Sequence, residues 1–182
     1  IIRGLVGSEM CIRDRPDSDT HFEHYIKDGS YQTVHRETIL RYIKMKKPEL
    51  KNCIDIGSHI GFWSKDFTNT FKHTYAFDPI PQVRECYIKN ITNNNYTLYP
   101  YALGREESKK MFLYSPTETG NTHASDKGNL EVTIKTLDSF ALNDIDYIKI
   151  DAEGYELEAL RGADKLIEKC RPCLLYTSDA AD

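Results

Sequence analysis

The nine residues from Cys53 to Gly61, CIDIGSHIG, constrain the fold of this chain more than any other stretch. An apolar run carries one carboxylate, Asp55, and ends in a turn that is bracketed by Gly57 and Gly61. Glycine lets the backbone adopt positive φ and approach a ligand closely. A strand, a glycine turn and a helix in this order form the first unit of an open α/β sheet, in which nucleotide-like ligands bind beyond the carboxyl ends of the strands.

Apolar patterns further along the chain continue this unit. The predicted parallel strands are 53–57, 74–77, 96–103 and 147–150. The predicted helices are 34–45, about 60–71, one that begins at Pro81, and 153–167. Two further strands, 111–114 and 130–134, predict a β-hairpin insertion between strands three and four. We therefore predict an α/β fold, a doubly wound and mostly parallel Rossmann-like sheet with helices on both faces.

The two ends of the chain resemble translated sequencing-adapter read-through. We therefore expect a foreign tail over 1–15, one domain over 16–172, and a second foreign tail over 173–182. The sheet would then be incomplete on its C-terminal side, and the strand over 147–150 would be a bare edge that is prone to aggregation.

The composition narrows the function classes. The net charge of −4 argues against a nucleic-acid partner, and the apolar runs are too short for a membrane span. Inside 16–172 the cysteines are Cys53, Cys86 and Cys170, an odd number without a C-x-x-C pair. Because no secretory signal is visible, we expect buried thiols in a reducing, cytoplasmic compartment.

Asp78 follows the second predicted strand, which we expect to lie beside the first. A carboxylate at that point can accept hydrogen bonds from both ribose hydroxyls of a nucleoside. The alternative is a solvated turn residue before Pro79. A dinucleotide would need G-x-G-x-x-G, but His59 and Ile60 interrupt that spacing.

S-adenosylmethionine has no phosphate and needs a ribose-binding acid, an apolar shelf for adenine and room for its amino-acid tail. Asp55 is placed to act on the ammonium group of that tail. The spacing therefore favours S-adenosylmethionine, with Asp55, Gly57, His59, Gly61 and Asp78 as candidate cofactor-binding residues.

The second group of candidates lies in KIDAEGYE, residues 149–156. Asp151 and Glu153 follow the fourth strand, where they can accept the proton of an acceptor hydroxyl. The alternative is helix capping, with Asp151 as N-cap and the glutamates favourable to the helix dipole. A divalent cation is less favoured, because only carboxylates converge and no histidine spacing helps.

Several aromatic and histidine side chains are weaker candidates. His59 can contact either cofactor or acceptor, and His123 in the insertion can face the pocket. Tyr31 and Gln32 are candidates for a lid over the cofactor, and Trp63 is expected in the core.

These motifs together resemble the FkbM family of S-adenosylmethionine-dependent methyltransferases, which has the class I methyltransferase fold. The similar segments are IDIGSHIGFWS at 54–64, AFDP at 76–79, YALG at 101–104, TLDSF at 136–140 and DYIKIDAEGYELEALRGA at 146–163. The resemblance implies methyl transfer to an oxygen of a sugar or another small metabolite. It implies cofactor contacts for Asp55, Gly57, Gly61 and Asp78, and it puts Asp151 and Glu153 in the acceptor-side signature. His59 stands where the family often has Asn.

We therefore expect an S-adenosylmethionine-dependent O-methyltransferase with a small-molecule acceptor, although this chain can be an inactive fragment. The first alternative is a truncated or decayed copy that binds cofactor without turnover. A nucleic-acid amino-methyltransferase is weaker, because it needs D/N-P-P-Y/F after strand four, where this chain has DAEG. A nicotinamide oxidoreductase is disfavoured by the glycine spacing. The sequence does not indicate the acceptor or an oligomeric state.

Overall fold

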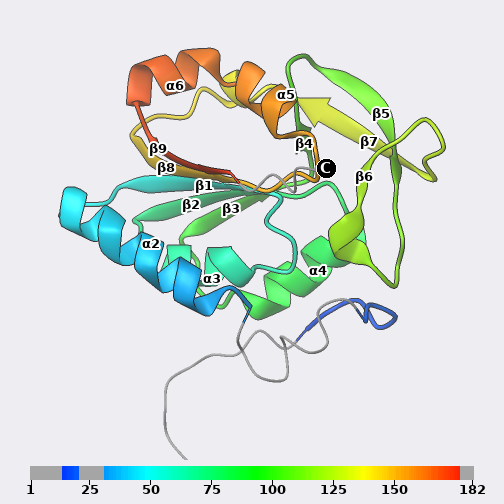
Figure 1. Ribbon diagram of the computed structural model, residues 1–182, viewed down its shortest axis with the longest axis horizontal. Coiled ribbons are helices and arrows are strands. Elements are labelled where there is room, and N and C mark those ends of the chain that lie inside the picture. Colours follow the sequence, from blue (N-terminus) through cyan, green and yellow to red (C-terminus); the bar gives the residue numbers. More distant parts are fainter. Residues whose placement is uncertain (1–13, 21–30, 177–182) are drawn as a thin grey trace, which may run out of the picture.

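The computed structural model describes residues 14–20 and 31–176. Its main sheet has five parallel strands in the order β3-β2-β1-β8-β9 (Figure 1). These strands are β1 (Asn52–Ile56), β2 (His73–Phe77), β3 (Tyr96–Tyr99), β8 (Ile145–Ile150) and β9 (Cys173–Tyr176). The predicted α/β class with a parallel sheet is confirmed.

Helices cover both faces of this sheet (Figure 1). One face carries α2 (Thr33–Lys46), α3 (Phe62–Thr68) and α4 (Pro81–Asn90), and the other carries α5 (Glu156–Arg161) and α6 (Asp164–Cys170). The alternation of side chains along each strand explains the two layers.

In β1, Cys53 packs toward Trp63 and Phe67 of α3, whereas Ile54 packs toward Ala159 of α5 on the other face. Because both faces are covered, the strands read as nearly continuous apolar runs.

The predicted strand 96–103 is wrong as a single element, because the chain turns at Pro100. β3 ends at Tyr99 in the main sheet, and β4 (Ala102–Leu103) pairs with β7 (Leu130–Lys135) in a second sheet. Proline has no N–H group to continue a ladder of hydrogen bonds, which accounts for the break.

The second sheet contains the predicted hairpin insertion. Its order is β4-β7-β5-β6, and β5 (Ser108–Leu113) runs antiparallel to both β6 (His123–Ala124) and β7. Two short 3-10 turns, η1 (Thr119–Asn121) and η2 (Leu137–Phe140), flank these strands. The hairpin prediction over 111–114 and 130–134 is therefore confirmed.

The predicted helix 153–167 is also wrong as a single element, since the structure divides it into α5 and α6. A side chain at Gly162 would place its Cβ 2.0 Å from the carbonyl oxygen of Gly104, so the two backbones touch there. Asp138 then accepts hydrogen bonds from the N–H groups of Lys165 and Leu166 and supports the start of α6.

The sequence analysis predicted that the strand over 147–150, which is β8 in the structure, would be an unpaired edge of the sheet. Within the described part of the chain this prediction is wrong. β9 pairs in parallel with β8 along its length, Tyr147 opposite Cys173 through Ile150 opposite Tyr176. β9 lies inside the segment that we expected to be a foreign tail. The domain boundaries at 16 and 172 stay predictions.

Two further expectations concern thiols and membranes. Cys53 and Cys86 are buried free thiols, and Cys170 is partly exposed. Within residues 14–20 and 31–176, none of the helices is long and apolar enough to span a membrane.

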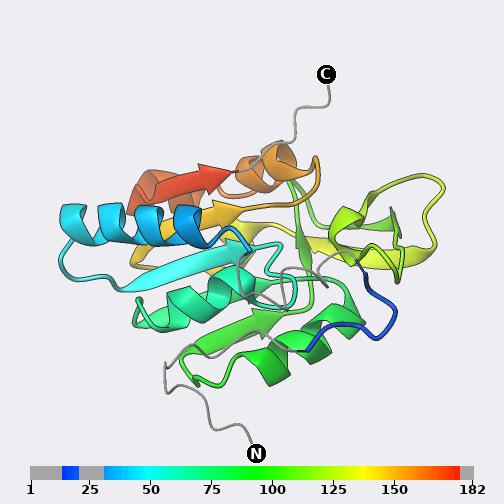
Figure 2. The ribbon, with the colours of Figure 1, turned by 60° about the horizontal axis from the view of Figure 1, so that its bottom comes forward.

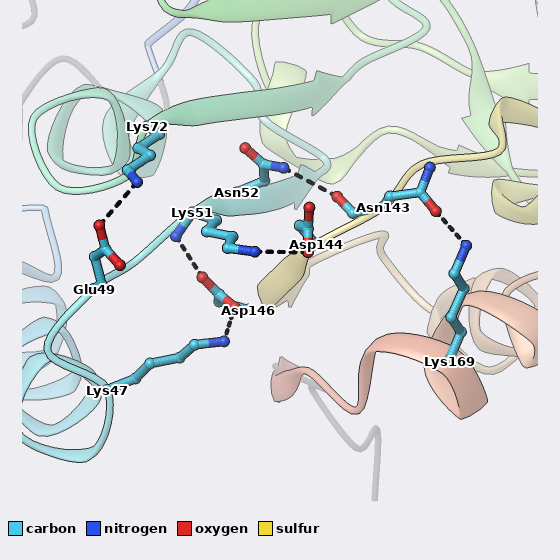
Figure 3. Close-up of polar contacts among 9 residues, drawn as sticks. All are labelled: Lys47, Glu49, Lys51, Asn52, Lys72, Asn143, Asp144, Asp146 and Lys169. Carbon is cyan, nitrogen blue, oxygen red and sulfur yellow. Dashed lines mark hydrogen bonds and ion pairs between the residues drawn. The ribbon is translucent and has the colours of Figure 1, made fainter.

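A cluster of polar contacts fastens the amino ends of β1 and β8 (Figure 3). The carboxylate of Asp146 is 3% exposed and accepts hydrogen bonds from the side chain of Lys47 and the backbone N–H of Lys51. Around it lie exposed pairs, such as Lys51 with Asp144 at 2.9 Å. This cluster is at the opposite end of the strands from the glycine turn, so it serves the fold.

We expect Asp146→Asn to lower the free energy of unfolding by about 2 kcal/mol, because it weakens two charge-assisted hydrogen bonds to a buried oxygen pair. Asp144→Asn is the matched control, since its partner contact is exposed and Asn tolerates the positive φ of 56° at this position. Urea unfolding of both variants measures the difference. Equal midpoints for the two variants would contradict this role of Asp146.

Candidate functional site

A cavity opens at the carboxyl ends of β1, β2 and β8, which point toward the second sheet (Figure 2). The space that it encloses is about 910 Å³ when the open solvent at its mouth is included. Five of the seven predicted site residues line it: Gly57, His59, Asp78, Asp151 and Glu153. The structure therefore brings the glycine turn, the end of β2 and the KIDAEG segment to one place.

Asp78 is the carboxylate that the structure places at the end of β2. Its two oxygens accept hydrogen bonds from different backbone N–H groups, Oδ2 from His59 at 3.0 Å and Oδ1 from Ile80 at 2.9 Å. The residue is 5% exposed, and burial raises the pKa of its carboxyl to about 6. Asp78 is thus a preorganised acceptor inside the cavity, not a solvated turn residue.

Gly57 is the residue that lets two strand ends meet. Its φ is 69°, and a Cβ here would lie 1.8 Å from the carbonyl oxygen of Asp151. Only glycine fits so close an approach of two backbones. The turn is also tied to β2, because the N–H groups of Gly57 and Ser58 both donate to the carbonyl oxygen of Phe77.

Gly61 lies outside the cavity wall. It precedes α3 with a φ of 98°, and a Cβ here would lie 2.9 Å from the side chain of Ile91. The structure therefore gives Gly61 a packing position between α3 and the end of α4.

Asp55 also lies outside the wall, beneath the turn on the face of β1 that packs against α3. It is fully buried, and Ser64 of α3 donates to its Oδ2 at 2.7 Å. Its Oδ1 is 3.3 Å from the ammonium group of Lys149. Asp55 therefore does not line the cavity itself, but it forms an ion pair with Lys149, which does.

Lys149 is the site residue that the sequence analysis missed. Its side chain is 3% exposed and bridges three groups: the carbonyl oxygen of Gly57 at 2.9 Å, Asp55, and Asp151 at 3.5 Å. Burial alone lowers the pKa of a lysine, but the carboxylates of Asp55 and Asp151 outweigh it and raise the pKa of Lys149 above its ordinary value.

A signal for this lysine was present in the sequence. Asp55 and Lys149 each have an isoleucine on either side, near the carboxyl ends of β1 and β8, and the structure pairs these two residues directly in register. Two opposite charges inside adjacent buried strands are each too costly to bury alone, so they are expected to meet.

The loop from 151 to 155 carries the two predicted acceptor-side carboxylates. Asp151 is partly buried, whereas Glu153 is exposed with a φ of 45°. Glu156 holds the loop, because its Oε1 accepts hydrogen bonds from the N–H groups of Ala152 and Gly154. α5 begins only at Glu156 with Tyr155 as N-cap, so the alternative that Asp151 caps this helix is wrong.

The remaining predicted candidates are placed as follows. Tyr31 lines the cavity with its ring 4.5 Å from that of Phe62, and Gln32 accepts a hydrogen bond from the indole of Trp63 at 2.9 Å. Trp63 is buried as expected, and it also reaches the wall. His123 is exposed on β6 and is not part of the wall.

Residues 55–180 match the model of the "Methyltransferase FkbM domain". This chain belongs to the FkbM methyltransferase domain family. The match covers the glycine turn, Asp78 and the whole KIDAEG segment, so the residues that line the cavity lie inside the FkbM domain match, with the exception of Tyr31.

Two curated relatives are similar to this FkbM chain. Methyltransferase 1 of Beauveria bassiana is 25% identical over 169 residues, which cover 72% of this chain and 66% of that protein. The hexuronic acid methyltransferase AglP of Haloferax volcanii is 29% identical over 123 residues, which cover 63% of this chain and 50% of that protein. The chain thus spans between half and about two thirds of the length of these relatives.

A solved structure agrees in fold. The crystal structure of Methyltransferase FkbM from Methylobacillus flagellatus KT superposes with a TM-score of 0.52 at 18% identity. The overlap covers 70% of this chain and 32% of that one, and it supports the FkbM fold described above.

The buried ion pair under the FkbM cavity gives a stability prediction. We expect Lys149→Met to lower the free energy of unfolding by about 4 kcal/mol, because it leaves Asp55 buried without a cation. The double variant Asp55→Asn with Lys149→Met should recover more than half of that loss, since it removes the orphaned charge as well. Urea unfolding of the three proteins measures these values.

Lys135→Met serves as the control, because its ion pair with Glu107 is exposed. If Lys149→Met costs no more than this control, the pair is not what holds β1 against β8.

Proposed function

We propose that this chain is the catalytic domain of an S-adenosylmethionine-dependent methyltransferase that transfers a methyl group to a hydroxyl oxygen of a small acceptor. The observation that carries the proposal is Asp78, a buried carboxylate in the cavity wall with both oxygens fixed by backbone N–H groups. Each oxygen keeps a lone pair for a further hydrogen bond, and two adjacent ribose hydroxyls are suitable donors.

The other groups in the wall fit an adenosyl ligand. Ile56, Phe77, Ile80 and Leu103 supply apolar surface for a base. The hydroxyl of Ser58 is buried in the wall and has no hydrogen-bond partner among the described residues. Because buried polar groups are nearly always satisfied, this hydroxyl favours a ligand with a polar group of its own.

The charges of the cavity favour a cationic cofactor over a phosphate. The N–H groups of Gly57, Ser58, His59 and Gly61 all donate within the protein, so they are not available to a pyrophosphate. The cavity wall carries the three carboxylates of Asp78, Asp151 and Glu153. Against these negative charges, the described part of the wall has one lysine, Lys149. This balance suits a sulfonium and an ammonium better than two phosphates, in agreement with the glycine spacing.

When bound, S-adenosylmethionine supplies a methyl group that is activated by its sulfonium. The protein would position the cofactor through Asp78 and the turn at Gly57. Asp151 and Glu153, at the carboxyl end of β8, are proposed to contact the acceptor and orient its hydroxyl. Lys149 contacts both Asp151 and the carbonyl oxygen of Gly57, so it would fix the distance between the acceptor side and the cofactor side of the cavity. Cofactor and acceptor would then be held in one relative orientation.

The insertion is placed to select the acceptor. Thr119, Gly120 and Thr122 of η1 and its flank form one side of the cavity. The relative AglP is named for a hexuronic acid, and we propose a sugar or similar hydroxylated metabolite for this chain too. Among the described residues there is no cluster of three or more histidine, cysteine, aspartate or glutamate side chains that could hold a metal ion.

We expect Asp78→Ala to weaken the binding of S-adenosylmethionine at least tenfold, because two hydrogen bonds to a charged acceptor are lost. Isothermal titration calorimetry measures the affinity, and thermal unfolding checks that the variant is folded. Asp126→Asn is the control, since Asp126 is an exposed turn residue of the insertion. Unchanged affinity in Asp78→Ala, or binding of NADH in preference to S-adenosylmethionine, would remove the proposed cofactor.

The same titration at several pH values provides an independent check. The pKa of Asp78 is about 6, and only its ionised form accepts from two hydroxyls. Affinity should therefore be constant above pH 7 and fall as the pH drops through about 6. An affinity that is independent of pH down to 5 would argue against a ribose contact by the carboxylate.

A further inference from the structure

The outward side of α2 (Thr33–Lys46) carries large apolar side chains that are exposed to solvent. Val34 is 74% exposed, Tyr42 is 54% exposed and Met45 is 73% exposed. Val34 and Met45 are the two most exposed large hydrophobic side chains in the described part of the chain. Both views of the ribbon show α2 on the outside of the molecule (Figures 1 and 2).

These three side chains belong to one stripe of the helix. Each residue of an α-helix is rotated by about 100° from the one before it, so Val34, Tyr42 and Met45 lie on one side. Leu40 and Ile43 are buried on the opposite side, against the core under α2. The helix is thus apolar on two sides, and packing within the domain satisfies only one of them.

Basic side chains flank the exposed stripe. Arg41, Lys44 and Lys46 are exposed, and Glu37 is the acidic residue of this helix. Arg41 and Lys44 form no ion pair with any residue that the structure describes, and the ammonium group of Lys46 lies 5.5 Å from the centre of the Tyr42 ring. α2 is therefore a region of positive charge on a chain whose net charge is −4.

We propose that this side of α2 binds the surface of a membrane that contains anionic lipids. The proposed surface, called the α2 face below, consists of the side chains of Val34, Arg41, Tyr42, Lys44, Met45 and Lys46. The contact is with the membrane surface, which agrees with the finding that no helix of the described residues is suited to span a membrane. It does not depend on the methyl transfer proposed above.

An anionic lipid surface matches both properties of the α2 face. Val34 and Met45 can enter the boundary between the head groups and the acyl chains, where apolar surface leaves water. Tyr42 is suited to the same depth, because tyrosine has an apolar ring and a polar tip. Arg41 and Lys44 have long apolar stems, which let their charged ends reach the anionic head groups beside the stripe.

A second copy of the chain fits the α2 face less well. In a symmetric dimer the same patch lies on both sides of the interface, so the basic side chains of one protomer would face those of its partner. Like charges that face each other oppose such a contact. Nucleic acid also fits less well, because its affinity comes mostly from phosphate contacts, whereas the centre of this face is apolar.

The α2 face is separate from the cavity. Its six residues are not among the described residues that line the cavity wall. The helix begins close to that wall, since Tyr31 lines it and α2 starts at Thr33. Variants of the α2 face therefore test membrane binding without removing a proposed contact to cofactor or acceptor.

The first test is sedimentation of the full chain with lipid vesicles. We expect binding to phosphatidylcholine vesicles that contain about one third phosphatidylglycerol, and affinity for pure phosphatidylcholine vesicles that is about tenfold weaker. Raising the salt concentration from about 0.1 M to about 0.5 M should release most of the protein, because the attraction between exposed charges is screened.

Charge variants locate the binding surface. The triple variant Arg41→Gln, Lys44→Gln and Lys46→Gln should bind anionic vesicles about tenfold more weakly than wild type. The matched control removes three exposed lysines of α4 and the insertion by Lys89→Gln, Lys109→Gln and Lys127→Gln. Its affinity should stay within about twofold of wild type, since these lysines lie outside the α2 face. Thermal unfolding checks that both variants are folded, as expected for exposed positions.

Apolar contact is tested separately. The double variant Val34→Ser and Met45→Ser should weaken binding about fivefold, because less apolar surface enters the lipid. Tyr42→Trp places a fluorescent reporter on the α2 face. Its emission should shift to shorter wavelengths on anionic vesicles and be quenched by brominated acyl chains. Trp63, the single tryptophan of the wild type, is 4% exposed, so the wild-type emission should not respond.

Three results would overturn the proposal. The first is a folded wild type that does not bind anionic vesicles, or that binds neutral vesicles equally well. The second is a triple variant that binds as tightly as the control. The third is a dimer in sedimentation velocity without lipid that Val34→Ser and Met45→Ser dissociate, which would assign the α2 face to a second copy of the chain.

Discussion

The ion pair between Asp55 and Lys149 lies beneath the cavity, and the positions of the other site groups depend on it. It joins β1 to β8 at matching positions of the sheet, and the same ammonium group holds the carbonyl oxygen of Gly57. Burying either charge alone would cost several kcal/mol, so each of the two charges is tolerated between the strands because the other is present. The close contact of Gly57 with the backbone of Asp151 follows from this pairing.

This arrangement explains how one small cavity gathers groups from remote parts of the sequence. The first glycine turn is fixed from below by Lys149 and from the side by the end of β2. Asp78 therefore faces the cavity with both oxygens oriented, and the loop at Asp151 stands opposite. The insertion closes the remaining side and brings Thr119 against His59. A site for a cofactor and an acceptor is thereby built almost entirely from strand ends.

The sequence predicted those parts of the fold that have a local signal. Apolar runs, glycine turns and Pro81 placed β1, β2, β8 and α4 within one or two residues, and the end of β2 made Asp78 a candidate. The breaks at Pro100 and Gly162 were missed because each depends on a second chain segment as well as on the residue itself. β9 was missed because its residues, 173–176, were assigned to a foreign tail.

The parts of the site that were missed depend on non-local contacts. Lys149 acquires its role only when β8 is placed beside β1, although the charge in an apolar strand was visible in the sequence. The contact of His59 with Thr119 and Asp19 joins residues from three separate regions, and neither local pattern nor spacing indicates it. Asp55 was assigned to the ligand on its position in the motif, whereas the structure turns it toward Ser64 and Lys149.

The most direct test of the account is a crystal structure of this chain with S-adenosylhomocysteine, the demethylated form of the proposed cofactor. The account predicts that the adenosyl group lies in the cavity, with both ribose hydroxyls within about 3.2 Å of the carboxylate oxygens of Asp78. A ligand bound outside the cavity, or one whose ribose is turned away from Asp78, would contradict it.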